Sequence, residues 1–219
     1  DSLESPEAKV AIMGILRDLR GIAEAATNKR TYNMLFEALH PSLFIMCKRV
    51  AETWHTEPTV MTALLKFIQE FVHNKSQRIV FDQSSANGIL LFRETSQIVC
   101  TYGSRILELP VQRDLFTEKY KGIRLMLNVL TCALSGDYVN FGVFALYQDP
   151  ALSESLKVSL GICMNIPIQD VLTYPKLSKA YFSFLEILFR NHLDVLSELD
   201  TDVFIALLSA SHEGLQSSD

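Results

Sequence analysis

The sequence has few residues that interrupt helices and no long apolar run. It contains nine glycines and seven prolines among 219 residues, well below the roughly 12% of average usage for the two together. The longest stretches without a charged residue, 125–136 and 158–169, are twelve residues each. A membrane-spanning helix needs about 18 or more. We therefore expect a helical protein with no membrane insertion.

An excess of basic charge is also missing. The chain carries 20 Lys and Arg against 25 Asp and Glu, a net charge of −5, and nucleic-acid-binding domains are typically basic. No nucleic-acid partner is expected. The charge is uneven, because 16 of the 20 cations lie in residues 1–124, while residues 125–219 carry four cations and eleven anions. The acidic half either attracts basic protein surfaces or simply provides solvated helix faces.

Motifs for catalysis and metal binding are absent from the sequence. The four cysteines lie at least 31 residues apart, without a CxxC pair or a histidine at zinc-ligand spacing. They are predicted to be buried, reduced thiols, as in the cytosol or nucleus. The sequence has no nucleophile elbow, phosphate-binding glycine loop or HExxH pair. We expect no catalytic residue, no cofactor and no metal.

Apolar residues recur with helical periodicity almost everywhere. Near the N-terminus they form one stripe that includes Ile12, Leu16 and Leu19, as on an amphipathic helix. Ser5 is a suitable N-cap and Pro6 a suitable first helical residue. Gly21 is expected to kink this helix or to end it early.

The same criteria predict the remaining helices. They cover about 31–39, 42–54, 60–72, 89–107, 117–134, 140–147, 150–163, 176–191 and 201–211. No segment alternates with the period of two that a half-buried strand requires. The predicted fold is all-α: a right-handed α-solenoid of antiparallel helix pairs, similar to HEAT or armadillo repeats, with about five repeats.

A weak internal similarity supports a repeat. Setting Pro58 against Pro175 aligns Phe67 with Phe184 and Asn74 with Asn191, among other matches. The offset of 117 residues is three times 39, close to the roughly 40–47 residues of a HEAT or armadillo unit. This interpretation places three repeats between the two prolines.

The long polar segment 74–88 is the leading candidate for a contact with a partner. Lys75 and Arg78 follow the strongly apolar helix predicted over 60–72. Cations at such a position stabilise a helix C-terminus, or they bind an acidic partner surface. Arg17 and Arg20 are similarly expected in local ion pairs or in a contact to the next repeat.

Several runs of residues resemble the importin-β-like family of nuclear transport receptors, and within it the exportins. They occur in one order along nearly the whole chain: 17–23 (RDLRGIA), 73–78 (HNKSQR), 87–94 (NGILLFRE), 133–136 (ALSG), 138–144 (YVNFGVF) and 174–178 (YPKLS). The resemblance implies a superhelix of HEAT repeats that binds cargo and the small GTPase Ran. It also implies that 1–219 is a single helical-repeat segment from the middle-to-C-terminal part of a longer chain, as the missing initial Met suggests.

The resemblance also implies the partners and the location. These are Ran-GTP, with its main contact outside this segment, together with protein cargo and nuclear pore proteins, during shuttling between nucleus and cytoplasm. Lys75, Arg78 and Arg93 are the candidate partner-binding residues, and Arg93 lies in one of the matched runs. Two alternatives stay open: a HEAT or armadillo scaffold without Ran dependence, and a helical enzyme whose site is assembled from dispersed residues.

Overall fold

The computed structural model describes residues 3–82, 84–193, 196 and 200–216. Within them it contains helices and loops and no strand. No helix of this described part is both long enough and apolar enough to cross a membrane. The elements are α1 (Pro6–Ala25), α2 (Lys29–Leu39), α3 (Ser42–Trp54), α4 (Pro58–Val72), the 3₁₀ turn η1 (Lys75–Gln77), α5 (Asn87–Ile106), the π-helical turn η2 (Phe116–Tyr120), α6 (Lys121–Leu134), α7 (Gly142–Leu146), α8 (Ala151–Asn165), α9 (Ile168–Thr173), α10 (Pro175–Asn191) and α12 (Thr201–Gln216).

The prediction of an all-helical chain is confirmed for the described residues. The first helix also begins where its capping residues predict. The Ser5 hydroxyl accepts a hydrogen bond from the Ala8 amide at 3.1 Å, and Pro6 is the first residue of α1. The predicted early end of this helix at Gly21 is wrong, because α1 continues to Ala25. No atom lies within 4 Å of a Cβ added at Gly21, so this glycine occupies an open helix face and costs only local stability. Helix α9 has six residues, too few to show a period.

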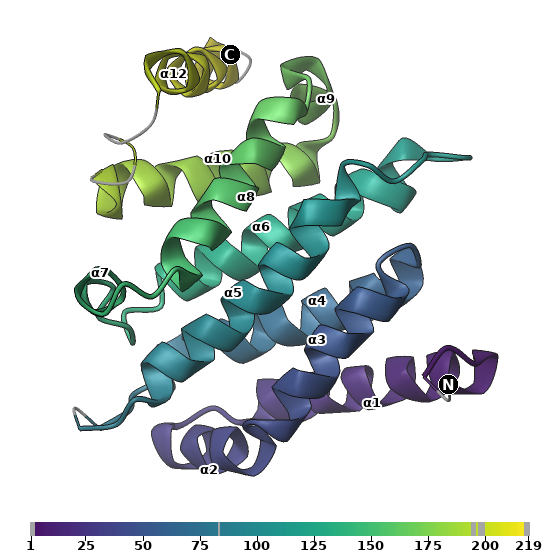
Figure 1. Ribbon diagram of the computed structural model, residues 1–219, viewed down its shortest axis with the longest axis vertical. Coiled ribbons are helices and arrows are strands. Elements are labelled where there is room, and N and C mark those ends of the chain that lie inside the picture. Colours follow the sequence, from purple (N-terminus) through teal and green to yellow (C-terminus); the bar gives the residue numbers. More distant parts are fainter. Residues whose placement is uncertain (1–2, 83, 194–195, 197–199, 217–219) are drawn as a thin grey trace.

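The long helices form two layers (Figure 1). In the first layer α3 packs against α5 and α5 against α8, and in the second α1 packs against α4, α4 against α6 and α6 against α10. Contacts of α3 with α4 and of α5 with α6 join the layers. The core therefore lies between two stacks of helices, an arrangement that is typical of a solenoid.

Helices within a layer run parallel. Lys9 Nζ and Glu57 Oε2 lie 2.5 Å apart and join the starts of α1 and α4. At the other end, the Tyr138 hydroxyl beyond α6 donates to the Val72 carbonyl at the end of α4, at 3.1 Å. Each first-layer helix leads along the chain into a second-layer helix, so the pairs α3/α4, α5/α6 and α8/α10 each place one helix in each layer.

The spacing of Pro58 and Pro175 has a different origin from the one predicted. Both prolines are the first residues of second-layer helices, α4 and α10. Only α6 lies between these two helices in the layer. The offset of 117 residues therefore corresponds to two helix pairs and not to three units of 39. The units are longer than predicted because the loop before η2 and the short helices α7 and α9 add residues to them.

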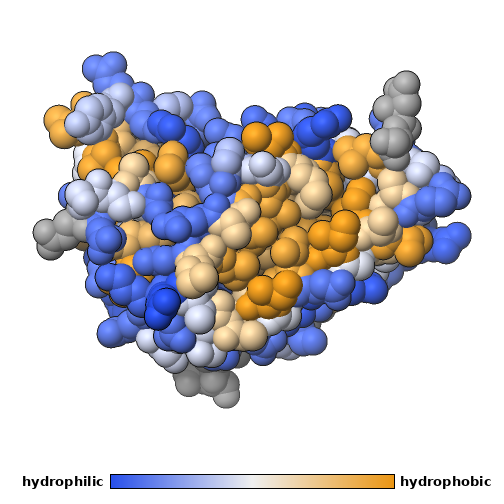
Figure 2. All heavy atoms as spheres, turned by 90° about the horizontal axis from the view of Figure 1, so that it is seen from below, coloured by the Kyte–Doolittle hydropathy of each residue, from blue (hydrophilic) through white to orange (hydrophobic). Residues whose placement is uncertain are grey.

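One end of the stack is apolar. Figure 2 views the molecule from the end where α1 and α2 lie, and hydrophobic side chains gather over a broad part of that face. Val10, Ile15 and Ile22 of α1 are 67%, 48% and 51% exposed, and Met34 of α2 is 61% exposed. Exposed apolar patches of this kind mark surfaces that bind other protein elements.

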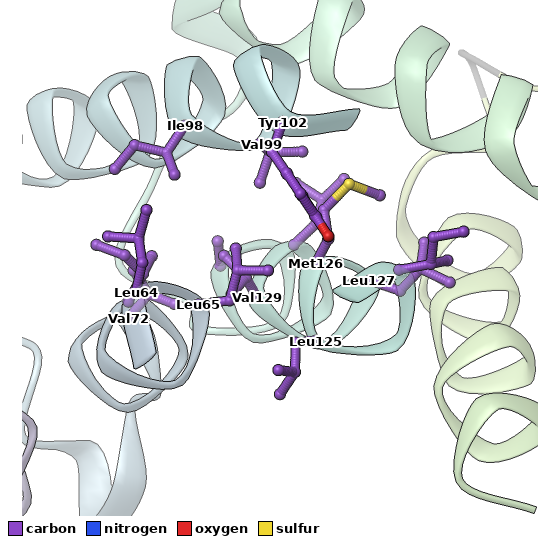
Figure 3. Close-up of a cluster of buried hydrophobic side chains, with 14 of the residues drawn as sticks. Leu64, Leu65, Val72, Ile98, Val99, Tyr102, Leu125, Met126, Leu127 and Val129 are labelled. Carbon is purple, nitrogen blue, oxygen red and sulfur yellow. The ribbon is translucent and has the colours of Figure 1, made fainter. Parts of the chain in front are cut away.

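The core around α4, α5 and α6 is built from close-packed apolar side chains, which lie between the layers and between neighbouring helices of the second layer (Figure 3). Burying each such side chain contributes roughly 1.5–3 kcal/mol. The fully or almost fully buried members include Leu64, Leu65, Val72, Ile98, Val99, Tyr102, Leu125, Met126, Leu127 and Val129. Because they come from consecutive pairs, the core continues from one pair to the next.

Gly103 allows α5 to approach α6 and α8 closely, and its substitution is the first prediction. A Cβ at this position would lie 2.6 Å from Val158 Cγ1, 3.0 Å from Met126 Sδ and 3.3 Å from Ile162 Cδ1. We expect Gly103→Ala to lower the free energy of unfolding by about 1–3 kcal/mol, because overpacking forces buried side chains to move. Urea denaturation followed by circular dichroism measures the change.

Gly161 provides the matched control. It lies inside α8, and nothing stands within 4 Å of an added Cβ. Gly161→Ala is therefore expected to raise the free energy of unfolding by up to about 1 kcal/mol, the usual gain in a helix interior. Two variants that shift stability in the same direction would contradict the packing assigned to Gly103.

Candidate partner-binding surface

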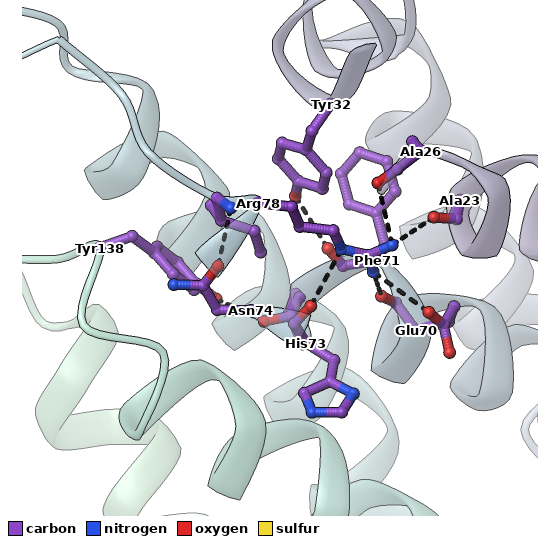
Figure 4. A network of polar contacts seen from close by, with 11 residues as sticks. Ala23, Ala26, Tyr32, Glu70, Phe71, His73, Asn74, Arg78 and Tyr138 are labelled. Carbon is purple, nitrogen blue, oxygen red and sulfur yellow. Dashed lines mark hydrogen bonds and ion pairs between the residues drawn. The ribbon is translucent and has the colours of Figure 1, made fainter. Parts of the chain in front are cut away.

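The last carbonyl groups of α4 accept hydrogen bonds from three side chains (Figure 4). Arg78 donates to the Glu70 carbonyl, the Tyr32 hydroxyl donates to the Phe71 carbonyl at 2.8 Å, and the Tyr138 hydroxyl donates to the Val72 carbonyl at 3.1 Å. A helix leaves its final carbonyls without backbone partners. We call Tyr32, Arg78 and Tyr138 the α4 cap. Because its members come from α2, from the loop after α4 and from the loop after α6, it fastens neighbouring helix pairs together.

Arg78 is the centre of the α4 cap. Its Nε donates to the His73 carbonyl at 3.2 Å, and one terminal nitrogen donates to the carbonyls of Ala23 and Ala26, the latter at 3.2 Å. The other donates to the Glu70 carbonyl and, at 3.2 Å, to the Glu70 carboxylate. These contacts account for all five N–H groups of a guanidinium. The side chain joins the end of α1 to the end of α4.

This placement gives Arg78 a role other than the predicted contact with a partner. The residue is 1% exposed, and its guanidinium carbon lies 5.6 Å from the centre of the Tyr32 ring. Burial raises the pKa of Tyr32, and the charge of Arg78 opposes part of that rise. A cation so enclosed offers no donor to an acidic surface, and it stabilises the C-terminus of α4 instead.

Lys75 is one of several exposed residues of the same loop. It begins η1, in which Ser76 and Gln77 adopt positive φ angles of 54° and 56°. Such angles cost non-glycine residues free energy. Asn74 holds the loop in place: its Oδ1 accepts from the Ile79 amide at 2.7 Å, and its Nδ2 donates to the Gly136 carbonyl at 2.6 Å. The loop is therefore ordered by the next helix pair.

A groove of about 760 Å³ runs beside this loop. One wall comes from the segment after α4 and the other from the segment after α6; the lining residues are Asn74, Gln77, Ile79, Val80, Phe81, Ser135, Gly136, Asp137, Tyr138, Val139 and Asn140. The predicted partner contact of the segment 74–88 thus has an open, mostly polar groove at its side.

Arg93 lies elsewhere, on α5 in the first layer. Its side chain is 45% exposed, and its Nε donates to Asp149 Oδ2 at 2.9 Å. Burial opposes ionisation of Asp149, yet the Ala151 amide and Arg93 together hold the pKa of its carboxyl below the usual value. The pair lines a cavity of about 690 Å³ together with Lys48 and Glu154.

The structure therefore does not assemble the three candidate residues into one site. Arg78 is internal, Lys75 is exposed at η1, and Arg93 borders a cavity between first-layer helices. It does bring together cations that sequence reasoning left apart. Arg17 and Arg20 of α1 share a small cavity of about 250 Å³ with Lys66 of α4. Their separation in the sequence gave no signal of this proximity.

Among the described residues, no group of three or more His, Cys, Asp or Glu side chains is placed to hold a metal ion. All four cysteines are free thiols, and Cys47 and Cys163 are buried. Burial raises the pKa of Cys47 to about 12 and that of Cys100 and Cys132 to about 11. Thiols protonated in this way are poor nucleophiles.

Comparison with known proteins finds similarity along the whole chain. The chain is 45% identical over 222 aligned residues to exportin-7-B of Xenopus laevis, covering all of this chain and 20% of that protein. It is 38% identical to exportin-7 of Dictyostelium discoideum, covering 22% of that protein, and 39% identical to human Ran-binding protein 17, covering 20%. No protein-family model and no solved structure matches. The chain thus spans about a fifth of the length of these curated relatives.

Proposed function

We propose that this chain is part of a nuclear transport receptor, because it is homologous over its whole length to a segment of exportin-7 and of Ran-binding protein 17, and over 97% of its length to a segment of Ran-binding protein 16. The observation that carries the proposal is the 45% identity to exportin-7-B across the entire chain. Similarity without a break along the chain supports a common fold and a common type of surface. The segment acts by binding proteins, without catalysis.

The proposed partners are Ran-GTP, protein cargo and nuclear pore proteins. The relatives include proteins named as Ran-binding proteins and proteins named as exportins. The main contact with Ran lies outside this segment. The receptor shuttles between nucleus and cytoplasm, and this segment contributes part of the protein-binding surface.

The proposed architecture is a right-handed solenoid segment of about five repeats. Three helix pairs that have one helix in each layer support it: α3/α4, α5/α6 and α8/α10. Helices α1 and α12 flank these pairs (Figure 1) and count as incomplete repeats at the two ends. The apolar face of α1 and α2 in Figure 2 is then covered by a further helix pair of the receptor, because each unit of a solenoid packs on its neighbours.

A chimera tests the function. The matching segment of Xenopus exportin-7-B is replaced by this chain, and binding of Ran-GTP, Ran-GDP and an exportin-7 cargo is measured by titration. We expect the chimera to prefer Ran-GTP and to bind cargo together with it, because the replaced segment is homologous over its whole length. A chimera that keeps the parent's helix content but binds neither partner would refute the proposal.

The control chimera carries an unrelated helical-repeat segment of equal length. It is expected to fold but to lose cargo binding, since its surface differs while its scaffold is similar. Equal performance of both chimeras would show that the segment acts only as a spacer. That result would contradict a role for its surface in recognition.

A further inference from the structure

Six cations lie across the second layer of helices. They are Arg17 and Arg20 on α1, Lys66 on α4, Lys121 and Arg124 on α6, and Lys176 on α10. These four helices pack side by side in that order. We call the six residues the cation row. Arg17, Arg20 and Lys176 are exposed, and the other three are half-buried.

The cations are close enough to act on one another. Arg17, Arg20 and Lys66 line one cavity of about 250 Å³, whose other walls include the polar side chains of Thr59 and Thr62. Desolvation lowers the pKa of Lys66, and the charges of Arg20, Lys121, Arg124 and Lys176 lower it further. One lysine in the middle of the row is thus repelled by cations from all three other helices.

Within the described part of the chain, no member of the cation row forms an ion pair with a carboxylate. Two carboxylates at the ends of α4 are occupied elsewhere, since Glu57 pairs with Lys9 and Glu70 with Arg78. The Nε of Arg124 is buried without a hydrogen-bond partner. In a chain of net charge −5, an unpaired row of cations is a local exception.

The dipole of α10 adds to the positive potential. Lys176 is the second residue of this helix, whose first turn has no acidic residue. Cations at a helix N-terminus oppose the helix dipole, whereas anions there are stabilised. Both the repulsion and the dipole of α10 therefore disfavour this arrangement in the isolated fold, and both favour a bound anion.

We propose that the cation row binds an acidic polypeptide segment of a partner protein, one rich in Asp and Glu. Packed helices lie about 8–10 Å apart, so four of them span roughly 25–30 Å. An extended segment of about eight residues reaches this length. This inference rests on the proposed function, because it names the chemistry of a partner for a protein-binding segment.

Nucleic acid fits the cation row less well. The cavity shared by Arg17, Arg20 and Lys66 has no aromatic side chain in its wall, and proteins that bind single strands usually stack bases on aromatic rings. The acidic remainder of the chain, with 25 Asp and Glu, also repels a long polyanion. A short acidic segment held across four helices avoids that repulsion.

The test uses a fluorescein-labelled oligo-glutamate peptide of about ten residues and measures its fluorescence anisotropy with the purified chain at low and at high salt. Binding that weakens with salt is expected. The double variant Lys66→Glu, Arg124→Glu is expected to lower the affinity at least about tenfold, because it reverses two neighbouring charges at the middle of the row. Circular dichroism verifies that the variant keeps its helix content.

The matched control is Arg113→Glu, Lys157→Glu, which changes the net charge equally at two exposed positions outside the cation row. It should retain at least about half of the wild-type affinity. No binding by the folded wild-type chain would overturn the inference, and so would an equal loss in the control. Tighter binding of a single-stranded oligonucleotide of equal charge, lost in the same double variant, would overturn it in favour of nucleic acid.

The exportin-7-B chimera separates this inference from the proposed function. If a chimera with the reversed charges at Lys66 and Arg124 binds cargo and Ran-GTP as well as the unmodified chimera, the function stands and the inference fails. If neither folded chimera binds them while the isolated chain still binds oligo-glutamate, the function fails and the acidic-segment site stands.

Discussion

Replacing Arg78 with methionine is expected to lower the free energy of unfolding by about 3–5 kcal/mol, the cost of breaking a buried charged network. Methionine has a similar length but no donor, so the carbonyls of Ala23, Ala26, Glu70 and His73 lose a partner. A domain of this kind is stable by roughly 5–15 kcal/mol in all. Urea denaturation followed by circular dichroism should show the loss directly.

Lys75→Met is the control, because Lys75 lies three residues earlier and is exposed. It should change the free energy of unfolding by no more than about 0.5 kcal/mol. Arg78→Lys is expected to recover only part of the loss, since an ammonium cannot reach carbonyls on two sides as a planar guanidinium does. Equal stability of the Arg78→Met and Lys75→Met variants would contradict the role of the α4 cap.

The elements that could be predicted from the sequence are those whose cause is local. Ser5 and Pro6 mark the start of α1 by capping and by a fixed φ angle. The apolar stripe of α4 follows from residues three and four positions apart, and its members are almost entirely buried. Helix type and approximate bounds were therefore accessible without knowledge of the tertiary structure.

Arg78 could not be interpreted from local pattern alone. Its carbonyl partners at Ala23 and Ala26 lie 55 and 52 residues earlier in the chain. In the sequence it is a cation in a polar loop, and such residues usually lie at the surface. The pattern therefore does not distinguish a buried arginine from an exposed one. The same limit applies to Lys66 and Arg124, which approach each other only because α4 and α6 pack side by side.

The spacing of the repeat was missed for a related reason. An offset divisible by 39 agreed with a known repeat length, but the short elements η2, α7 and α9 lengthen the units without adding a second-layer helix. Such insertions carry no strong apolar stripe. Length arithmetic alone therefore counted one pair too many between Pro58 and Pro175.

Asn74→Ala is the second large expected effect, about 2–3 kcal/mol of unfolding free energy. The substitution removes the acceptor of the Ile79 amide and the donor to the Gly136 carbonyl. Both bonds join the loop after α4 to buried residues, and Ser76 and Gln77 then lose the constraint that keeps their φ angles positive. Hydrogen exchange of the Ile79 amide should accelerate along with the fall in stability.

Asn191 makes this prediction specific. It aligns with Asn74 when Pro58 is set against Pro175, so a repeat argument predicts equal roles for the two asparagines. Asn191, however, is exposed at the end of α10, where solvent can replace its contacts, and Asn191→Ala should cost no more than about 0.5 kcal/mol. Comparable losses in the two variants would mean that the shared sequence position decides their role. A loss confined to Asn74→Ala would mean that the bonds to the Ile79 amide and to the Gly136 carbonyl decide it.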